Sequence, residues 1–529
     1  MKFLNLVKII CFLLICSLTQ PSLGAEFGGK IVLAMLGEPS NLIPPLATDS
    51  ASHEVADLIY VSLLKYDQNL RLVGWAAKDF KVLDGGKRFH FWLHKNIYWF
   101  DGKPLTAKDV YFTYKLMIDP KTPTAYGEDF KLVKNFKIIS PYEFEVTYPK
   151  VYAQALASWT ISILPKHALE KENLLHTKYA RKPLGAGPYE LSQWISGRRL
   201  ILKVNPNYFE GRAYLDRVIY RIIPDMGTMF LELKAGNLDM MNLSPEQYKY
   251  QTRGDYWQTH FNKYQYLAFA YTYLGYNLRH PFFRDRRVRQ AIAMAINKKE
   301  IIQGVLLGLG KPTIGPYKPG TWVYNQKLKD FAYDPQKAKK LLAQAGFKDS
   351  NGDGILEKNG RPFVFTLMTN QGNSLRLKTA IIIQYRLAQI GIKVKIRTVE
   401  WATFIHDFID KGRFEAVILG WSIPQDPDLY DVWHSSRAVP GGLNFIDFKN
   451  KEVDELLVKG RETLDLVKRK QIYDRIQEIL HFEQPYCFLY VPMALPIVSK
   501  KIHGISPAPA GIDYNFIRWW IPKSAQLLP

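Results

Sequence analysis

Apolar positions cluster most densely in a stretch that alternates between strand and helix patterns. Near-continuous apolar or β-branched runs at 363–369, 393–399 and 414–421 are each long enough to form a strand. Between the first two runs, apolar residues recur at helical spacing over 374–390, and Gly391 follows as a C-terminal cap. Such runs are typical of parallel strands that helices cover on both faces. The stretch therefore predicts a β-α-β-α-β unit of an α/β fold.

The expected strands end in polar, turn-rich segments. Residues 370–374 follow the first strand and contain Asn370 and Asn373, and residues 422–428 follow the third strand. In open α/β sheets, ligands bind in the crevice beyond the carboxyl ends of the strands. We therefore expect a binding crevice between these segments, with Asn370 and Asn373 as candidate contacts. Turn formation with Gly372 is the alternative role for both asparagines.

Other segments carry signals for single elements. Strands are expected at 30–36, 88–94, 217–224 and 486–493, and helices at 53–64, 107–117, 285–307, 335–345 and 461–480. Ser52 is the expected cap of the first helix, and Thr106 with Asp109 forms a capping box for the second. Asp334 and Gly346 mark the start and the end of the helix between them.

The N-terminus has the pattern of a secretory signal peptide. Lys2 and Lys8 form a basic start, residues 9–18 are apolar, and small residues end the segment. Large apolar residues precede Cys16, so the small residue that lipoprotein processing requires is missing. No later segment is apolar over the roughly 18 residues that a membrane span needs. We therefore expect residues 1–24 to be removed on export and the mature protein to be soluble.

The charge of the chain is strongly basic. The formal net charge is +22, and it is +20 without the lysines of the expected signal peptide. Such an excess could favour acidic ligands, nucleic acid or an anionic membrane surface. However, basic clusters such as 284–289 lie where a helix is expected to begin and match no binding motif. A generally basic surface is the simpler interpretation, and we expect no nucleic-acid partner.

Signatures of enzymes and of metal sites are weak in this sequence. The loop at 349–360 places Asp349, Asn351 and Asp353 as in the first half of a calcium loop, but its twelfth position is a glycine instead of a bidentate glutamate. A turn is therefore the expected structure. The sequence contains no G-x-S-x-G, H-E-x-x-H or C-x-x-C motif, and Cys487 lies in an apolar run that predicts a buried thiol. We expect neither an enzyme nor a cofactor or metal site.

Several long motifs together resemble the family 5 extracellular solute-binding proteins, the oligopeptide- and dipeptide-binding group of ABC importers. They occur in the family's order and span nearly the whole mature chain. The matching motifs are GEPSNLIPPL, YWFDGKPLTAKDVYFTY, PLGAGPYEL, NPNYFEGRAYLDRVIYRIIPD, LKAGNLD, YNLRHPFFRDRRVRQAIAMAINKKEII, YDPQKAKKLLAQAGF and NFIDFKNKEVDELL. The resemblance implies an α/β, two-lobed periplasmic-binding-protein fold of type II with an additional domain.

The resemblance also implies how the chain is divided. Lobe I would be discontinuous and consist of 25–64, 181–275 and 501–529. The extra domain, 65–180, would pack on lobe I, and lobe II would span 276–500. The cleft between the lobes would close on the ligand.

The resemblance further implies a set of ligand contacts. In relatives, an extended peptide pairs its backbone with strands of both lobes, a form of β-augmentation. The implied contacts are Asp49 and Ala51 in a first-lobe strand and Trp421, Ser422 and Ile423 in a second-lobe strand. Tyr276 and Asn277, at the start of lobe II, are expected as cleft or hinge residues.

One implied contact departs from the family's pattern. In relatives, a carboxylate after the tryptophan holds the α-ammonium group of the ligand. Here Pro424 stands where many relatives have that aspartate, and the segment is one residue shorter. Asp426 and Asp428 are the remaining candidates. Turn formation for both, and helix capping for Asp428, are their alternative roles.

The function that the resemblance implies is that of a periplasmic substrate-binding subunit. It would capture peptides as a monomer and deliver them unchanged to an inner-membrane ABC permease. The same fold could instead bind an oligosaccharide, a metal chelate or haem, because fold does not decide the ligand. The alternative from another class is a periplasmic hydrolase, which would turn its ligand over instead of releasing it intact.

Overall fold

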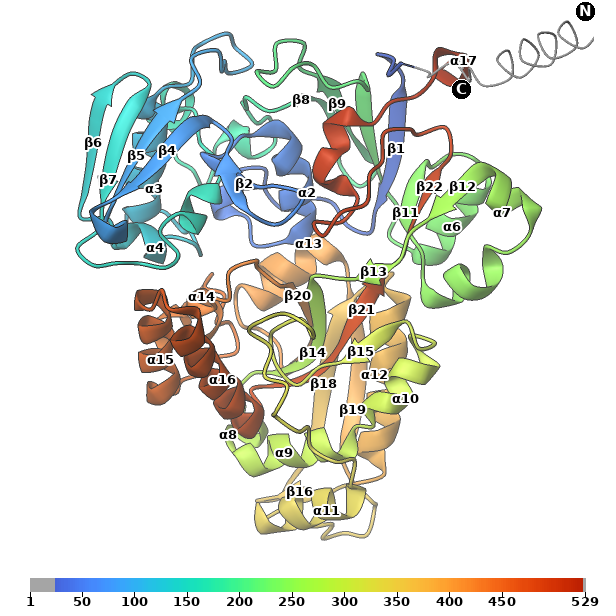
Figure 1. The fold of residues 1–529 in the computed structure, drawn as a ribbon. Coiled ribbons are helices and arrows are strands. Elements are labelled where there is room, and N and C mark those ends of the chain that lie inside the picture. The colour runs from blue at the N-terminus through green and yellow to red at the C-terminus, as the bar shows by residue number, and fades with distance from the viewer. Residues whose placement is uncertain (1–23, 527–529) are drawn as a thin grey trace, which may run out of the picture.

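The computed structural model describes residues 24–526, which form two lobes (Figure 1). The first lobe contains a seven-stranded sheet in the order β12-β22-β11-β1-β10-β9-β8. Its strands are β1 (Lys30–Met35), β8 (Tyr189–Ile195), β9 (Arg199–Val204), β10 (Arg217–Ile222), β11 (Met240–Asn242), β12 (Phe261–Lys263) and β22 (Pro496–Ser499). Its helices are α2 (Ser50–Ile59), α6 (Met226–Lys234), α7 (Asp255–His260) and α17 (Lys523–Gln526). Strand β1 pairs in parallel with both β10 and β11.

The second lobe contains a sheet in the order β13-β21-β14-β20-β18-β19, with β15 beside β21. Its strands are β13 (Tyr266–Leu267), β14 (Ala270–Tyr276), β15 (Gly310–Pro312), β18 (Val364–Asn370), β19 (Lys393–Val399), β20 (Ala416–Ser422) and β21 (Tyr486–Ala494). Its helices are α8 (Pro281–Arg284), α9 (Arg286–Ala295), α10 (Lys298–Gly304), α11 (Pro335–Gln344), α12 (Ser374–Ala388), α13 (Trp401–Thr403), α14 (Tyr430–Trp433), α15 (Lys451–Glu462) and α16 (Leu466–Glu483). A small hairpin of β16 (Glu357–Lys358) and β17 (Arg361–Pro362) lies near α11 at the far end of this lobe (Figure 1).

A third sheet, in the order β4-β5-β7-β6, lies beside the first lobe (Figure 1). Its strands are β4 (Ala77–Leu83), β5 (Arg88–Leu93), β6 (Asn135–Ser140) and β7 (Glu143–Thr147), next to the hairpin β2 (Leu64–Tyr66) and β3 (Leu72–Gly74) and the helices α3 (Ala107–Ile118), α4 (Glu128–Lys131) and α5 (Lys166–Leu169). The strand predicted at 88–94 is confirmed as β5, in which Phe89, Phe91 and Leu93 are buried on one face. This sheet has its own hydrophobic core.

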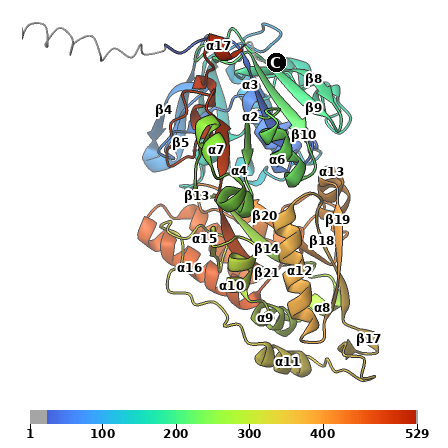
Figure 2. The same cartoon turned by 90° about the vertical axis from the view of Figure 1, so that its right-hand side faces the viewer.

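The chain crosses between the lobes at two neighbouring points, seen between the lobes in Figure 2. One crossing follows β12, and the other lies between β21 and β22. The two crossing segments lie side by side, because Tyr264 N donates to Pro496 O at 2.9 Å. The crossings move the expected lobe boundaries. Strand β14, before residue 276, belongs to the second-lobe sheet, and β22, before residue 501, belongs to the first-lobe sheet. Apolar strand residues continue through both crossings, so composition does not mark them.

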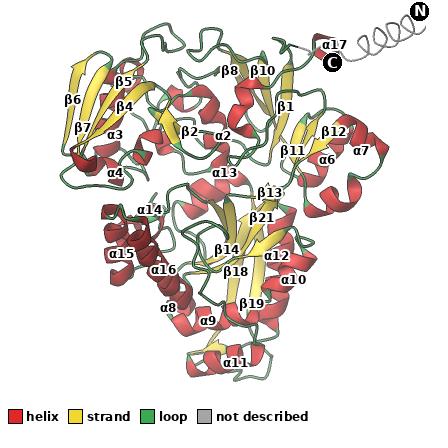
Figure 3. Cartoon of the chain, in the orientation of Figure 1, coloured by secondary structure: helices red, strands yellow, loops and turns green. Residues whose placement is uncertain are grey.

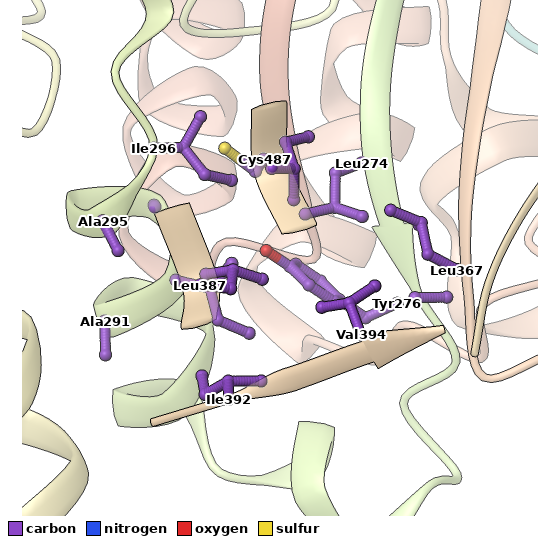
Figure 4. Packing of buried hydrophobic residues seen from close by; sticks show 14 of the residues in the cluster. Leu274, Tyr276, Ala291, Ala295, Ile296, Leu367, Leu387, Ile392, Val394 and Cys487 are labelled. Atoms are coloured by element: carbon purple, nitrogen blue, oxygen red, sulfur yellow. The ribbon is translucent and has the colours of Figure 1, made fainter. Parts of the chain in front are cut away.

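The stretch with the densest apolar pattern forms the centre of the second lobe (Figure 3). Strand β18 pairs in parallel with β19 and β20, and α12 packs against this part of the sheet. The predicted β-α-β-α-β unit is therefore confirmed. Cys487 lies in the same core (Figure 4), where burial raises the pKa of its thiol to about 11. The prediction of a buried thiol is confirmed as well.

Capping residues explain where the prediction of helices succeeded and where it was wrong. Asp334 caps α11 by accepting from Lys337 N at 2.9 Å, as predicted. The expected helix 285–307 is instead two helices, because Asn297 accepts from two backbone amides and starts α10. The expected helix 461–480 spans the break between α15 and α16, where Asp465 starts α16. Apolar periodicity continues through both breaks and therefore hides them.

The expected signal peptide, residues 1–24, lies outside the described residues except for Gly24. Among the helices of residues 24–526, none combines the length and the apolar character that a membrane span requires.

Candidate ligand-binding cavity

A cavity of about 880 Å³ lies between the two lobes. Its first-lobe side is formed by α2, and residues of the extra domain, such as Tyr126 and Gln154, complete that side. Its second-lobe side is formed by the start of α12, the carboxyl end of β20 and residues 428–432. The volume is in the range of ligand-binding pockets. The carboxyl ends of the parallel strands thus face a cavity, as is typical of α/β sheets.

Strand β20 exposes one backbone edge to this cavity. It pairs with β14 along residues 416–422, but its pairing with β18 stops at Val417. Ile418 O faces β18, where it accepts from Thr369 Oγ1 at 3.0 Å. Backbone groups alternate in direction along a strand, so the N–H and C=O groups of Gly420 and Ser422 point the same way as Ile418 O, away from β14. Within residues 24–526, no strand pairs with this part of the edge.

Aromatic and polar side chains frame the open edge. Trp421 lines the cavity and donates from Nε1 to the Tyr486 hydroxyl at 3.3 Å, which fixes its ring. Ser422 is exposed in the cavity wall. Ile423 is buried, and its backbone N–H donates to Phe269 O at 2.8 Å. Of the three residues expected in the second-lobe strand, Trp421 and Ser422 therefore face the cavity and Ile423 does not.

The two candidate aspartates are both held by arginine side chains. Arg469 binds Asp426 through both oxygens, at 2.7 and 2.9 Å. Arg461 binds Asp428 Oδ2 at 2.7 Å, and the Asp428 side chain is only 2% exposed. Asp428 lines the cavity, whereas Asp426 does not. Neither carboxylate is free to take the full charge of a ligand ammonium group, because each already neutralises a guanidinium group.

Asp49 lies at the cavity, but in a different local structure from the one expected. It caps α2 by accepting from Ser52 N at 3.0 Å, and its other oxygen accepts from Ser52 Oγ at 2.7 Å. The expected cap, Ser52, is thus the donor, and the segment that was expected as a strand is the start of a helix. Ala51 is buried and borders a smaller adjoining cavity of about 290 Å³.

Tyr276 and Asn277 are not cavity residues. Tyr276 is fully buried in the second-lobe core, as Figure 4 shows. Asn277 donates from Nδ2 to Phe414 O at 2.8 Å and so fixes the chain just before β20. Their expected role in the cleft is wrong, because the lobe crossing lies at Tyr264, well before them.

The asparagines at the end of β18 position α12. Asn373 caps this helix by accepting from Arg376 N at 3.0 Å, and it lines the cavity. Asn370 accepts from Arg376 Nη1 at 2.8 Å and borders the smaller cavity. Both asparagines therefore serve the turn and helix start, and they also hold Arg376 at the cavity wall.

Sequence reasoning missed several charged residues of the cavity. They are Glu54, Asp57, Asp129, Arg376, Asp410, Asp431 and Arg461. The pKa values of Asp410 and Asp129 are both raised to about 6, mainly because the two carboxylates are buried. Two of these residues could have been found from the sequence. Glu54 and Asp57 lie three positions apart on α2, away from its buried face at Val55 and Ile59, and this spacing indicates neighbouring side chains on a helix.

The loop at 349–360 uses its polar side chains for its own turn. Asp349 accepts from Gly352 N and Gly354 N at 2.8 and 3.0 Å. Asn351 accepts from Asp353 N at 2.9 Å, and Asp353 accepts from Ile355 N at 2.8 Å. Residues 24–526 contain no group of at least three histidine, cysteine or carboxylate side chains arranged to hold a metal ion.

A second hollow, of about 760 Å³, lies between α6, residues 244–251 and the start of α12. Lys378 and Glu246 form an ion pair across it at 3.3 Å. These opposite charges compensate each other, so this hollow offers a ligand fewer uncompensated charges than the main cavity does.

Comparisons with known proteins agree with this geometry. Residues 71–440 match the family described as "Bacterial extracellular solute-binding proteins, family 5 Middle". Oligopeptide-binding protein AppA of Bacillus subtilis is 35% identical over 510 residues, covering 94% of this chain and 92% of that protein. Heme-binding protein A of Haemophilus influenzae is 27% identical, covering 94% of this chain and 93% of that protein.

Solved structures show the same architecture. The structure of Bacillus subtilis AppA in complex with a nonapeptide has a TM-score of 0.89 and 33% identity, covering 94% of this chain and all of that one. NikZ from Campylobacter jejuni in complex with Ni(L-His) has a TM-score of 0.83 and 27% identity, covering 93% and 99%. The match over most of the length, together with the two lobes and the cavity between them, shows that this chain belongs to the bacterial extracellular solute-binding proteins of family 5, which are binding proteins and not enzymes.

Proposed function

We propose that the chain is the substrate-binding subunit of an ABC importer and that it binds peptides, from dipeptides to oligopeptides, in the cavity between the lobes. The observation that supports this ligand class is the open edge of β20. Gly420 and Ser422 present backbone donors and acceptors to the cavity, and an extended peptide carries the complementary groups at the spacing of a strand. Oligosaccharides, metal chelates and haem carry no such row of groups.

The peptide lies along residues 419–422 in this proposal. Backbone pairing is independent of side chains, so it accepts varied sequences. Trp421 and Ser422 then contact the ligand, and Asp49, Asn373 and Asp428 border it at the cavity wall. The nonapeptide that AppA holds in its solved structure supports the same ligand class.

The cellular setting is part of the proposal. The protein is periplasmic after removal of residues 1–24, works as a monomer, and passes its ligand to an inner-membrane permease. In this proposal the extra domain remains 65–180, and the lobe boundaries move from the expected 276 and 501 to the crossings at Tyr264 and Leu495. We expect osmotic shock of the host cells to release the protein. We expect light scattering of the purified protein to give the mass of one chain. Retention in the membrane or a dimer mass would contradict these expectations.

The ligand class is tested on protein purified from its host. Native mass spectrometry followed by denaturation is expected to release peptides of several sequences. A single sugar, a chelate or haem would overturn the proposal, and hydrolysed fragments of an added peptide would favour the hydrolase alternative. Recovery of the added peptide intact supports binding without chemistry.

Backbone pairing is tested with methylated peptides. A peptide that binds is resynthesised with a methyl group on each backbone nitrogen in turn, and affinity is measured by calorimetry. Loss of a backbone hydrogen bond is expected to weaken binding by about tenfold at one or two positions. The matched control carries the same extra methyl group on the neighbouring side chain. Equal effects of both methyl positions at every residue would show that the edge of β20 does not pair with the ligand.

A further inference from the structure

The cavity wall carries charges that the protein itself does not compensate. Seven carboxylates and two guanidinium groups line the cavity, in a chain whose formal net charge is +22. The positive charge of the chain therefore lies elsewhere, and the cavity is acidic. An acidic cavity in a basic protein points to a ligand that brings positive charge with it.

The two neighbouring cavity carboxylates that have no ion pair among the described residues lie on α2. Glu54 and Asp57 lie on the same face of the helix, and both side chains are exposed to the cavity. Within the described part of the chain, neither carboxylate has a hydrogen bond or an ion pair, and His53 is the one basic group that acts on Asp57. Asp513 lies near Glu54 and adds a third negative charge, so burial between the lobes and like charges raise the pKa of Glu54 to about 7.

The opposite wall carries an uncompensated positive charge. Arg376, on the first turn of α12, has no carboxylate partner among residues 24–526; its Nη1 donates to the neutral amide of Asn370 at 2.8 Å. Its Nη2 lies over the backbone of Gly420, where an added Cβ atom would come within 3.0 Å. A charge held at a cavity wall without a partner is costly unless a ligand supplies the partner.

Of the second-lobe aspartates, Asp426 and Asp428 do not compete for a ligand cation, and Asp410 is a single carboxylate to which Thr48 Oγ1 donates at 3.5 Å. Arg469 already neutralises Asp426, and Arg461 already neutralises Asp428. We infer that Glu54 and Asp57 of the first lobe hold the cationic group of the ligand, and that the cavity therefore selects peptides that place an ammonium or guanidinium group against α2. This inference rests on the proposed peptide function and assigns its charge specificity.

The test uses the full mature protein, freed of ligand, and a panel of matched alanine-based peptides of one length. Each peptide has one alanine replaced by lysine, norleucine or glutamate, and every position is substituted in turn. Each peptide is made in two forms, one with a free and one with an acetylated N-terminus. Lysine peptides are expected to bind at least about tenfold more tightly than norleucine peptides at one position. If the α-ammonium group is the cation that α2 binds, acetylation causes the loss instead, and the lysine side chain has no effect.

The protein side of the test is the double substitution Glu54→Gln with Asp57→Asn. It is expected to abolish the advantage of the cationic peptide and to leave the affinity of the acetylated norleucine peptide within about twofold. The matched control is Glu452→Gln with Glu455→Gln, an exposed acidic pair at the same spacing on α15. The control is expected to keep the cationic preference.

The outcomes separate this inference from the proposed function. If no peptide of any charge binds, the proposed function fails. If peptides bind but neither lysine nor the free N-terminus matters, or if the double variant keeps the preference, the charge assignment is overturned while the peptide function stands.

A thermal unfolding curve shows whether the double variant is folded. Removal of the crowded carboxylates is not expected to lower its melting temperature. If the double variant is nevertheless unfolded, the single substitution Glu54→Gln replaces it, and this variant is expected to lower the cationic preference by about twofold or more. An unchanged preference in the single variant would contradict the inference.

Discussion

The surroundings of the Glu54 carboxylate disfavour its ionised form. Burial raises its pKa from 4.5 to about 7, with further contributions from Asp513 and Asp57. In the unfolded chain this group loses its proton near its ordinary pKa. Between pH 4.5 and about 7 the folded state therefore binds more protons than the unfolded state, and the free energy of unfolding falls as the pH rises through this window. The ionised Glu54 carboxylate therefore lowers the free energy of unfolding of the ligand-free protein, and a bound cation would offset this effect.

Replacing Glu54 by Gln is expected to stabilise the ligand-free protein at about pH 8 and to change little at about pH 4. The gain is limited to about 1 kcal/mol, because Glu54 is exposed to the cavity and an exposed charge is partly screened by solvent. Thermal unfolding at several pH values measures the effect. Glu452→Gln is the control, since its carboxylate pairs with Arg475 at an exposed site. A Glu54→Gln protein that is less stable than the parent at about pH 8 would contradict this account.

The residues that the sequence analysis could not place are those whose partners lie far away in the chain. Asp426 and Asp428 follow the tryptophan as the family's pattern suggests, but their arginine partners are 43 and 33 positions further on. No local pattern shows that Arg469 and Arg461 return to this loop. By contrast, the spacing of Glu54 and Asp57 on α2 was visible in the sequence. Its meaning depended on a cavity that only the packing of two lobes creates.

At the scale of elements, long periodic segments were predictable and short links between them were not. The strands and helix from β18 to β20 follow from apolar runs that need no distant partner, and their parallel pairing follows from burial on both faces. The breaks at Asn297 and Asp465 depend on one capping side chain each, within a continuous apolar pattern. The start of α2 at Ser50 depends in the same way on Asp49.

One short element links the lobes away from the cavity. Arg437, at the end of the turn that follows α14, donates from Nη1 to Glu128 Oε1 at 2.7 Å and from Nη2 to Ala125 O at 2.9 Å in the extra domain. A second link lies at the cavity wall, where Arg461 pairs with Asp129 at 2.8 Å. Opening of the cavity would expose these buried groups to water, so the contacts favour the closed arrangement of the lobes.

Arg437→Gln is expected to weaken peptide binding although Arg437 does not line the cavity. A buried hydrogen bond to a charged group contributes about 1.5–3 kcal/mol, so we expect a loss of roughly ten- to hundredfold in affinity. Calorimetry measures the affinity, and small-angle scattering of the ligand-free protein is expected to show a larger radius of gyration. Arg475→Gln, which removes ion pairs within one lobe, is the control. Unchanged affinity in the Arg437 variant would show that this contact does not favour closure.

At the scale of the whole molecule, the net charge and the charge of the cavity have opposite signs. The basic excess, which is +20 without the lysines of the expected signal peptide, acts on a peptide at a distance, whereas Glu54 and Asp57 act only on a peptide inside the cavity. The overall charge of the chain therefore does not reveal the charge of its ligand. Association and dissociation of a cationic peptide should consequently respond to salt for different reasons.

Stopped-flow fluorescence can separate these effects, because Trp401 and Trp421 line the cavity and report on its occupation. Raising the salt concentration from about 20 to about 300 mM shortens the Debye length severalfold and screens the repulsion between the basic surface and a lysine peptide. We expect its association rate constant to rise a few-fold and its dissociation rate constant to rise as well, since salt also weakens the contacts to α2. An acetylated norleucine peptide serves as the uncharged control, with rate constants that hardly change. A fall in the association rate constant of the lysine peptide would mean that the acidic cavity already dominates the field at its entrance, and that the basic surface plays no part in ligand capture.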